Sequence, residues 1–459
     1  MALSVGLNSV MRALLAQQQA LDVASHNVAN VNTPGYSRQR LRLASVPASN
    51  PSQPGLPGNG VQVIGTERIR NIFIDFQRRG QEQAAGYYAV KTDSLKLVET
   101  SLGEPGESGL RQAMNDFFNA WRDVANDPEQ SAMRSAVVQA GTSLGFTATR
   151  IDGQLRSMRD DANRRVAATV TEINGLADQI ASINGQIISL RGIGDPAGDL
   201  TDRRDHSIDR LSRLVDVQYT ETASGSMTVS IGGRSLVSGS NVRGLTTATN
   251  AANNNYLDVQ WASDGAALSS ATGELGGLIN QRDVDLPQRL ADFNAVVTQL
   301  MADVNTAHAT GFARDGVTTG TAFFTGSDAS DIAVNAAVTG NIDLVGAASL
   351  AGAAGDGSNA LGLADLQWAK TMGGATQSYD EFYNSLVTSL GVDAKNAQTL
   401  ADAQALSVQQ LDQLQQSEAG VNLDEEMVNI VQFQRAYQAA ARVISVIDDM
   451  LDTLINRTI

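Results

Sequence analysis

Residues 21–40 read LDVASHNVANVNTPGYSRQR, and this stretch joins the end of a long helix to the start of an extended segment. Asn30 and Asn32 compete with the backbone for helical hydrogen bonds. Pro34 then removes a backbone donor, and Gly35 admits a left-handed conformation. The stretch therefore predicts that a helix ends near residue 30 and that the chain changes direction directly after it.

Apolar residues upstream of this break recur at intervals of three, four or seven. This spacing predicts an amphipathic helix that begins near the first residue. Its apolar stripe consists of Leu7, Val10, Leu14, Leu21 and Val28. Downstream of the break, polar and apolar residues alternate over 36–43, 61–64 and 68–75, and a loop rich in proline and glycine occupies 47–60. We expect a small β-hairpin here, between two helical regions.

The run ANVNTPGYSR over residues 29–38 resembles the N-terminal signature of the flagellar axial proteins, a family of rod, hook and hook-associated proteins. Its continuation into Gln39 looks most like the hook-associated members. A plain helix end with a proline turn would use the same residue types, but so long and ordered a motif rarely arises by chance. The resemblance implies an assembly motif formed by Asn30, Asn32, Thr33, Pro34, Gly35, Tyr36 and Arg38.

A second one-sided helix is expected from Leu423 to the C-terminus. Asn422 suits its N-cap, and the acids at 424–426 suit the positive end of the helix dipole. Its apolar residues in heptad register include Met427, Ile430, Tyr437, Ile444 and Leu451. The apolar face is too wide for a two-stranded seam. We therefore expect it to pair with the N-terminal helix as an antiparallel coiled coil and to bury its remaining apolar surface between copies.

The interior of the chain alternates between helical and β patterns. Residues 166–190 keep two apolar positions per heptad, which predicts a coiled-coil seam. Residues 215–278 alternate as strands between glycine-containing turns. Helical spacing returns over 283–308, and residues 310–360 are expected to form short strands and loops. A further helix from residue 379 has an expected core face of Leu390, Ala397, Leu400, Leu411 and Leu414.

These patterns predict a mainly α fold with an inserted β domain. A long coiled-coil-like helical bundle is formed by the N- and C-terminal segments, and a β-rich domain lies outside it. The expected domains are a terminal coiled coil (1–35 and 421–459), a helical bundle with the small hairpin (36–214 and 365–420), and an inserted outer domain with a helix near 283–308 (215–364).

The chain is acidic, with 33 Lys or Arg against 49 Asp or Glu and a formal net charge of −16. Nucleic acids and anionic membranes select basic surfaces, so neither is expected as a partner. Residues 1–100 are the exception, with ten Lys or Arg and six Asp or Glu. This basic part would help to orient neighbouring copies, and a solvated surface explains it equally well.

The sequence lacks the patterns that catalysis requires. It contains no phosphate loop, nucleophile elbow or HExxH motif, and its three histidines are scattered. We therefore expect neither an enzyme nor a cofactor. Asp199, Asp202 and Asp205 recur at every third position, a spacing that suggests the ligands of a metal cluster. Arginines among them and the lack of an oxygen-rich loop favour a structural role, with Asp199 or Thr201 as a helix cap, so no metal is expected.

Composition alone suggests a cytoplasmic protein. There is no cysteine, no Sec-type signal peptide and no apolar run long enough to cross a bilayer. The resemblance implies otherwise, because flagellar axial proteins pass unfolded through the flagellar type III export channel without cleavage. The absence of cysteine suits a chain that moves from a reducing to an oxidising space.

The resemblance implies a secreted structural protein of the bacterial flagellum that forms the ring between hook and filament through its terminal helices. The implied partners are further copies of the chain, the hook protein, the second junction protein FlgL, and the export chaperone FlgN, held by the C-terminal helix. Two alternatives remain: another axial protein of the hook or distal rod type, and a coiled-coil signalling protein or extracellular adhesin. The latter would not explain the motif at 29–38.

Overall fold

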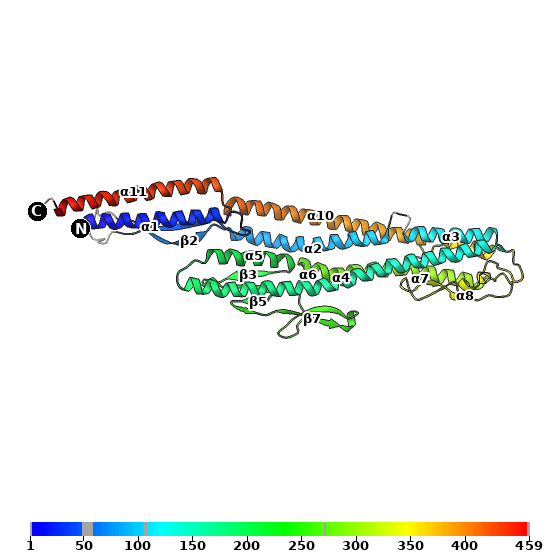
Figure 1. Cartoon of the computed structure of the whole chain (residues 1–459). Coiled ribbons are helices and arrows are strands. Elements are labelled where there is room, and N and C mark those ends of the chain that lie inside the picture. Colours follow the sequence, from blue (N-terminus) through cyan, green and yellow to red (C-terminus); the bar gives the residue numbers. More distant parts are fainter. Residues whose placement is uncertain (1, 48–57, 105, 107–108, 270–271, 457–459) are drawn as a thin grey trace.

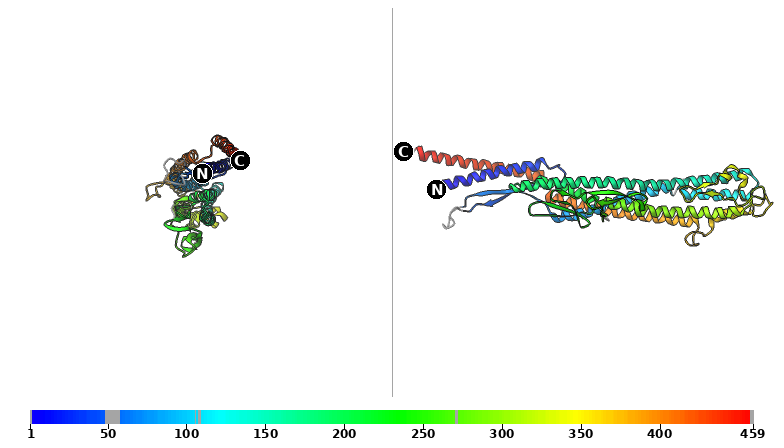
Figure 2. Two further views of the ribbon diagram at one scale, coloured as in Figure 1. Left: turned by 90° about the vertical axis from the view of Figure 1, so that its left-hand side faces the viewer. Right: turned by 90° about the horizontal axis from the view of Figure 1, so that it is seen from below.

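The computed structural model describes residues 2–47, 58–104, 106, 109–269 and 272–456. The molecule is a long, narrow rod of helices, and both chain ends lie at the same extremity (Figure 1). Strands between residues 218 and 261 lie along one side of the rod (Figures 1 and 2). The expected fold class, mainly α with an inserted β part, is confirmed.

The terminal arm consists of α1 (Ala2–Ala29) and α11 (Leu423–Asn456). The two helices lie antiparallel, side by side, and extend beyond the other helices of the molecule (Figure 1). An antiparallel hairpin of β1 (Gln39–Ser45) and β2 (Val61–Arg68) packs against α1. Most of the loop expected at 47–60 lies outside the described residues. The expected pairing of the two chain ends is thus present within a single copy.

The shaft behind the arm contains α2 (Ile72–Leu102), α3 (Leu110–Asn126), α4 (Ser131–Gly192) and α10 (Tyr379–Ala419). α10 packs along α2 and ends just before α11 begins. The strand pattern expected at 68–75 is wrong, because the chain is helical from Ile72 onward. Asn71 explains the difference: its side chain accepts a 3.0 Å hydrogen bond from Phe73 N and caps the helix.

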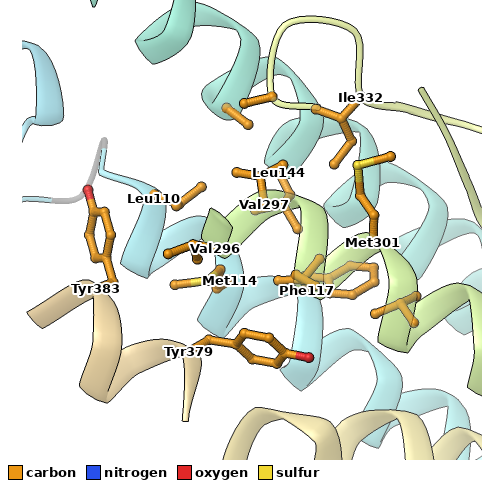
Figure 3. Packing of buried hydrophobic residues seen from close by; sticks show 14 of the residues in the cluster. Leu110, Met114, Phe117, Leu144, Val296, Val297, Met301, Ile332, Tyr379 and Tyr383 are labelled. Carbon is orange, nitrogen blue, oxygen red and sulfur yellow. The ribbon is translucent and has the colours of Figure 1, made fainter. Parts of the chain in front are cut away.

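One hydrophobic core closes the end of the shaft far from the arm. Figure 3 shows how Met114 and Phe117 of α3 pack with Val296 of α7 (Leu286–Thr310) and with Tyr379 of α10. The segment after α7 covers this core with short strands and loops, as expected, and with two short helices besides. Its elements are β9 (Phe324–Thr325), β10 (Ala333–Val334), α8 (Ala336–Gly340) and α9 (Ser358–Asp365).

A second core joins the half of α4 nearer the arm to the β layer. Val166, Ile173 and Ile180 of α4 pack there against several elements, a broader surface than the coiled-coil seam expected from the sequence. The helices are α5 (Gly198–Leu214) and α6 (Gly273–Asn280). The strands form a sheet in the order β3 (Gln218–Glu221), β4 (Met227–Ile231), β5 (Arg234–Ser238), β6 (Asn241–Val242), and a pair of β7 (Leu245–Asn250) and β8 (Tyr256–Trp261).

Asparagines of α4 fix the β layer by binding its backbone. The Asn184 side chain donates to the carbonyl oxygens of Met227 (2.8 Å) and Gly239 (2.9 Å) and accepts from Met227 N (3.1 Å). Asn174 donates to Leu245 O and accepts from Leu245 N, both at 2.8 Å. These bonds satisfy backbone groups at the end of the β4–β5 ladder and at the start of β7, so side chains of α4 extend the hydrogen bonding of the layer.

The two cores divide the chain differently from the domain limits drawn from the sequence. The β layer shares its core with α4 and α5, and residues 286–364 share theirs with α3 and α10. The limits at 214/215 and 364/365 therefore stay a prediction about folding units, which limited proteolysis would test.

Candidate assembly site at the base of the terminal arm

The seven motif residues lie at the base of the terminal arm, where α1 turns into β1 and α10 passes into α11. We call this region the joint and define it as residues 26–39 together with residues 415–426. A backbone hydrogen bond connects its two parts, since Arg38 N donates to Ala419 O at 2.9 Å. The motif therefore lies where the first and last segments of the chain meet.

The first half of the motif forms a tight turn. The backbone and the side chain of Asn30 both donate to His26 O, at 3.1 and 3.0 Å, and Thr33 N donates to Asn30 O at 2.9 Å. Gly35 follows with a φ of +78°, and a Cβ at this position would lie 3.2 Å from the Cβ of His206 on α5. Left-handed backbone and close approach together require glycine here.

Tyr36 ties the turn back to α1. Its hydroxyl donates to Asn27 Oδ1 at 2.8 Å, and His26 Nδ1 lies 3.0 Å from the same hydroxyl. Burial, reinforced by the charge of Asp199, raises the pKa of Tyr36 above its ordinary value. The phenol therefore keeps its proton and remains a donor to Asn27.

Arg38 joins the two ends of the chain. Its Nε donates to Glu426 Oε1 at 2.7 Å and its Nη1 to Glu425 Oε2 at 3.1 Å. Glu426 is only 2% exposed, and Asn27 Nδ2 donates to its second oxygen at 3.2 Å. Asn27 also accepts from Gln39 N at 3.0 Å. This buried network holds the last turn of α1, the start of β1 and the first turn of α11 together.

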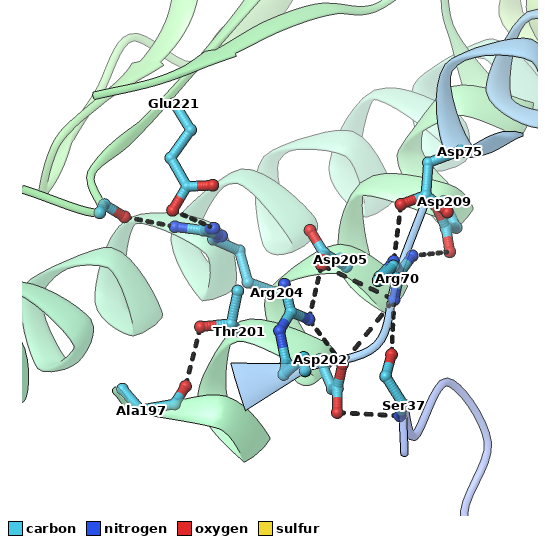
Figure 4. A network of polar contacts seen from close by, with 12 residues as sticks. Ser37, Arg70, Asp75, Ala197, Thr201, Asp202, Arg204, Asp205, Asp209 and Glu221 are labelled. Carbon is cyan, nitrogen blue, oxygen red and sulfur yellow. Dashed lines mark hydrogen bonds and ion pairs between the residues drawn. The ribbon is translucent and has the colours of Figure 1, made fainter. Parts of the chain in front are cut away.

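A row of aspartates on α5 anchors the joint to the shaft (Figure 4). Asp202 accepts from Ser37 N at 3.0 Å and from Arg68 Nη1 at 2.6 Å. Asp205 accepts from the same guanidinium at 3.0 Å, and Arg70 lies 3.6 Å from it. The basic residues expected to orient neighbouring copies thus include several that pair within the chain.

The row continues in both directions along α5. Asp209 accepts from Arg79 Nε at 2.6 Å, and Asp199 accepts from Gln39 Nε2 at 2.8 Å. The expected capping role of Asp199 or Thr201 is wrong, because α5 begins at Gly198, both residues lie inside it, and Ala197 occupies the N-cap. The structure shows no group of His, Asp or Glu residues arranged to hold a metal within the ranges it describes.

The electrostatics of the aspartate row depend on the arginines. Burial alone would raise the pKa of Asp205, but the guanidinium groups of Arg70, Arg68 and Arg79 outweigh it and hold the pKa below its ordinary value. Asp202 differs, because burial raises its pKa despite Arg68. The row is thus an intramolecular salt-bridge network between the shaft and the base of the arm.

The outer half of the motif contributes little to these contacts. Asn32, Thr33 and Pro34 are exposed and line a groove of about 650 Å³. The opposite wall of the groove is formed by residues 416–425, at the passage from α10 to α11. The motif therefore has an inner half that builds the joint and an outer half that faces solvent.

The apolar residues expected to drive assembly are not the most buried ones of the arm. Eight of them are half-buried: Leu7, Val10, Leu14, Leu21, Val28, Ile430, Ile444 and Leu451. Met427 and Tyr437 are exposed, by 54% and 39%. The buried face of α1 instead carries Ala16, Ala20 and Ala24 in line with Asn27. Sequence reasoning missed this face, although the spacing of four between alanines is a signal for close helix contact.

Comparison with known proteins places the chain in a family. A model of the flagellar hook-associated protein FlgK helical domain matches residues 95–324. Flagellar hook-associated protein 1 of Bacillus subtilis is 32% identical over 495 residues, which cover 98% of each chain. The chain belongs to the flagellar hook-associated protein 1 family. It is accordingly a structural axial component of the flagellum, as the resemblance of the motif implied.

The terminal segments match more general models of the axial proteins. The flagella basal body rod protein model matches residues 7–36, and the C-terminal model of the basal body rod FlgEFG proteins matches residues 408–457. Flagellar hook-associated protein 1 of Escherichia coli is 29% identical over 98% of this chain and 99% of its own. These matches support contacts with copies of itself and with hook-related components.

The fold is shared with a solved structure of the family. The flagellar hook junction protein FlgK from Burkholderia pseudomallei superposes with a TM-score of 0.66 over 74% of this chain and 99% of its own, at 17% identity. In the described residues, no helix combines the length and apolar character needed to span a membrane.

Proposed function

We propose that this chain forms the ring at the junction between hook and filament and that its copies associate through the terminal arm. The distribution of apolar side chains on the arm is the observation that carries the proposal. Within the described side chains of α1 and α11 no large apolar residue is fully buried, whereas Met11, Leu15, Val443 and Met450 are exposed. The arm thus keeps apolar surface for neighbouring copies.

The joint supports this role mechanically. A ring subunit must hold its arm at a fixed angle to its shaft, and the buried pair of Arg38 and Glu426 with the α5 aspartate row provides that connection. Copies related by a repeated rotation then bury the same surfaces at each step, in a heterologous interface. The outer motif residues Asn32, Thr33 and Pro34 are available for such contacts. We assign the chain a structural role without catalysis.

The exposed apolar surface of the terminal arm also accounts for the remaining partners that we propose. The hook protein lies on one side of the ring and FlgL on the other. Met427, Val428 and Val431 of α11 are exposed, so a chaperone of the FlgN type has an apolar surface to shield before assembly. Export through the flagellar type III channel without a cleaved signal fits the sequence, which contains no cysteine.

Deletion of the gene tests the proposal. The expected result is cells that retain hooks and lack attached filaments, seen by electron microscopy, with filaments restored by the full-length chain. Normal filaments in the deletion strain would refute the junction role.

A further inference from the structure

A shallow groove of about 610 Å³ lies between α2 and α10, behind the joint. Its walls include Phe76 on α2 and Leu414 on α10, which are 65% and 50% exposed. Gly80 and Ser407 are small lining residues, and a Cβ at Gly80 would meet no heavy atom within 4 Å. None of the lining residues is charged. The groove is therefore uncharged and partly apolar, a surface that can accept a helix with apolar side chains.

The sequence pattern of α10 indicates that this surface is meant to be covered. Leu400 and Leu414 follow the apolar pattern of a buried face and were expected in the core, yet both are exposed. Leu390 and Ala397, on the same helix, are buried against the shaft. The apolar face of α10 is therefore wide, and a single copy of the chain covers only part of it.

We propose that this groove receives α11 of a second copy of the chain, through the exposed stripe of Val443, Val446 and Met450. This inference rests on the proposed function and adds the surface on which the arm lies. The three side chains are spaced by three and four residues, so they share one face of α11. The contact is heterologous, because the arm of one copy lies on the shaft of the next.

Charge supports a second copy as the occupant. No Lys or Arg occurs between Lys395 and Arg435, so α10 has only acidic charges in this part. Asp412 pairs with Arg78 of α2, and the exposed Asp402, further along α10, forms no ion pair with any described residue. On α11, Arg435 and Arg442 are exposed and form no ion pair with any described residue. The acidic surface of α10 and the basic surface of α11 around Arg435 and Arg442 are complementary in charge. A chain of net charge −16 needs such complementarity in order to associate with its own copies.

The arrangement fixes how far neighbouring copies are displaced. α10 and α11 follow one another along the rod (Figure 1). Gln410 in the groove and Val446 in the stripe are 36 positions apart. If Val446 of one copy lies over Gln410 of another, the two copies are displaced along the rod by roughly 50 Å, at 1.5 Å per residue. Asp402 of the shaft then lies level with residue 438 of the arm, between Arg435 and Arg442.

Cross-linking tests the contact directly. The chain contains no cysteine, so a Gln410→Cys, Val446→Cys variant has only the two introduced thiols. Within one copy these lie too far apart for a short bismaleimide. In junctions isolated from cells that make the variant, the reagent is expected to give dimers and longer ladders. The single variants and a Gln410→Cys, Gln438→Cys pair, with residue 438 about two turns away, are expected to give none.

A blocking substitution gives an independent readout. Gly80→Trp fills the groove from an open helix surface, and Gly175→Trp places the same side chain on α4, where a Cβ also meets no atom within 4 Å. We expect Gly80→Trp to lower incorporation into junctions by about tenfold or more, the factor that corresponds to about 1.4 kcal/mol. Gly175→Trp should incorporate like the parent chain, and both purified proteins should unfold as it does.

The outcomes separate this inference from the proposed function. Junctions that contain normal amounts of the cysteine-pair variant without ladders, or that incorporate Gly80→Trp normally, would overturn the groove contact and leave the junction role intact. Normal filaments in the deletion strain would instead remove the junction role itself.

Discussion

Arg38 and Glu426 form the most direct side-chain link between the two ends of the chain. Glu426 is buried and has two partners, Arg38 on one oxygen and Asn27 on the other. A buried carboxylate that loses its cation keeps its desolvation cost without compensation. The pair therefore decides whether α11 stays attached to the base of α1.

Arg38→Ala is expected to loosen this attachment. Breaking a buried ion pair by removing one partner costs about 3–5 kcal/mol, and we expect the lower end because Arg38 itself is partly exposed. Amide exchange in the first turns of α11 should accelerate while exchange in α4 stays unchanged. Arg40→Ala is the matched control, since Arg40 pairs with Glu67 at the surface and its loss should cost at most about 1 kcal/mol. Equal exchange in the two variants would contradict the assigned role.

His308 makes the stability of the core at the end of the shaft far from the arm depend on pH. Its Nδ1 lies 2.6 Å from Thr321 O, and Gly346 N donates to its Nε2 at 2.9 Å, so the ring must be neutral, with its proton on Nδ1. Burial lowers the pKa of His308 below its ordinary value of 6.5. Below pH 6.5 the unfolded chain gains a proton that the folded chain does not, and stability falls as pH falls.

We expect His308→Gln to remove this contribution to the pH dependence. Urea unfolding between pH 7.5 and pH 5.5 should show the parent losing stability more steeply than the variant, by up to about 1.4 kcal/mol per pH unit. His206→Gln serves as the control for a histidine outside this core. Parallel pH profiles for parent and His308→Gln would show that the ring is not held neutral.

At the residue scale, sequence reasoning identified Arg38 through the motif but not its partner. Glu426 lies 388 positions away, and nothing in the local pattern distinguishes it from Asp424 or Glu425, which are exposed. The three acids were interpreted as complements of a helix dipole. Only the packing of the two chain ends selects which of them becomes buried.

At the scale of elements, α1 shows two faces with different roles. Its small face of Ala16, Ala20 and Ala24 is buried, and its larger apolar side chains, such as Leu14 and Leu21, are half-buried. Alanines spaced by four let neighbouring elements approach closely. The periodicity of the apolar residues located the helix. Hydrophobicity scales give most weight to large apolar residues, so they do not reveal that the alanine face is the more closely packed one.

Ala20→Leu is expected to force α1 away from its neighbours. Overpacking a tight contact costs about 1–3 kcal/mol, and here it acts on the arm alone. Gln18→Leu adds the same side chain at an exposed position and should have little effect. Thermal unfolding of the arm, followed by a probe on α11, should separate the two variants. A loss of stability that is no larger for Ala20→Leu than for Gln18→Leu would contradict the close packing of this face.

Other elements show where local patterns are insufficient. The alternation of residues 68–75 suggested a strand, but the Asn71 cap begins a helix whose Ile72, Phe73 and Phe76 remain exposed. The same pattern of apolar residues arises from a strand face and from a helix surface whose apolar residues are exposed. The β layer at 218–261 lies within the predicted range of 215–278, because strands between glycine turns give a signal that needs no partner. The end of that range was wrong, since residues 273–280 form the helix α6.

At the scale of the whole molecule, stability is distributed unevenly along the rod. The shaft has two cores with large side chains, while the fully buried residues described on the arm are alanines, Asn27 and Glu426. We therefore expect the isolated chain to be monomeric and its arm to open more readily than its shaft. Native-state hydrogen exchange should show faster exchange in α1 and α11 than in α4. Equal protection of arm and shaft in the free monomer would contradict this expectation.

Removal of the arm tests the central claim most directly. A chain without residues 1–25 and 427–459 retains the joint and both cores, and it should fold with the same cooperative unfolding of the shaft as the full chain. Its incorporation between hook and filament, measured by electron microscopy and immunolabelling of isolated hooks, is expected to be lost. A truncated chain that still occupies this position would contradict the account.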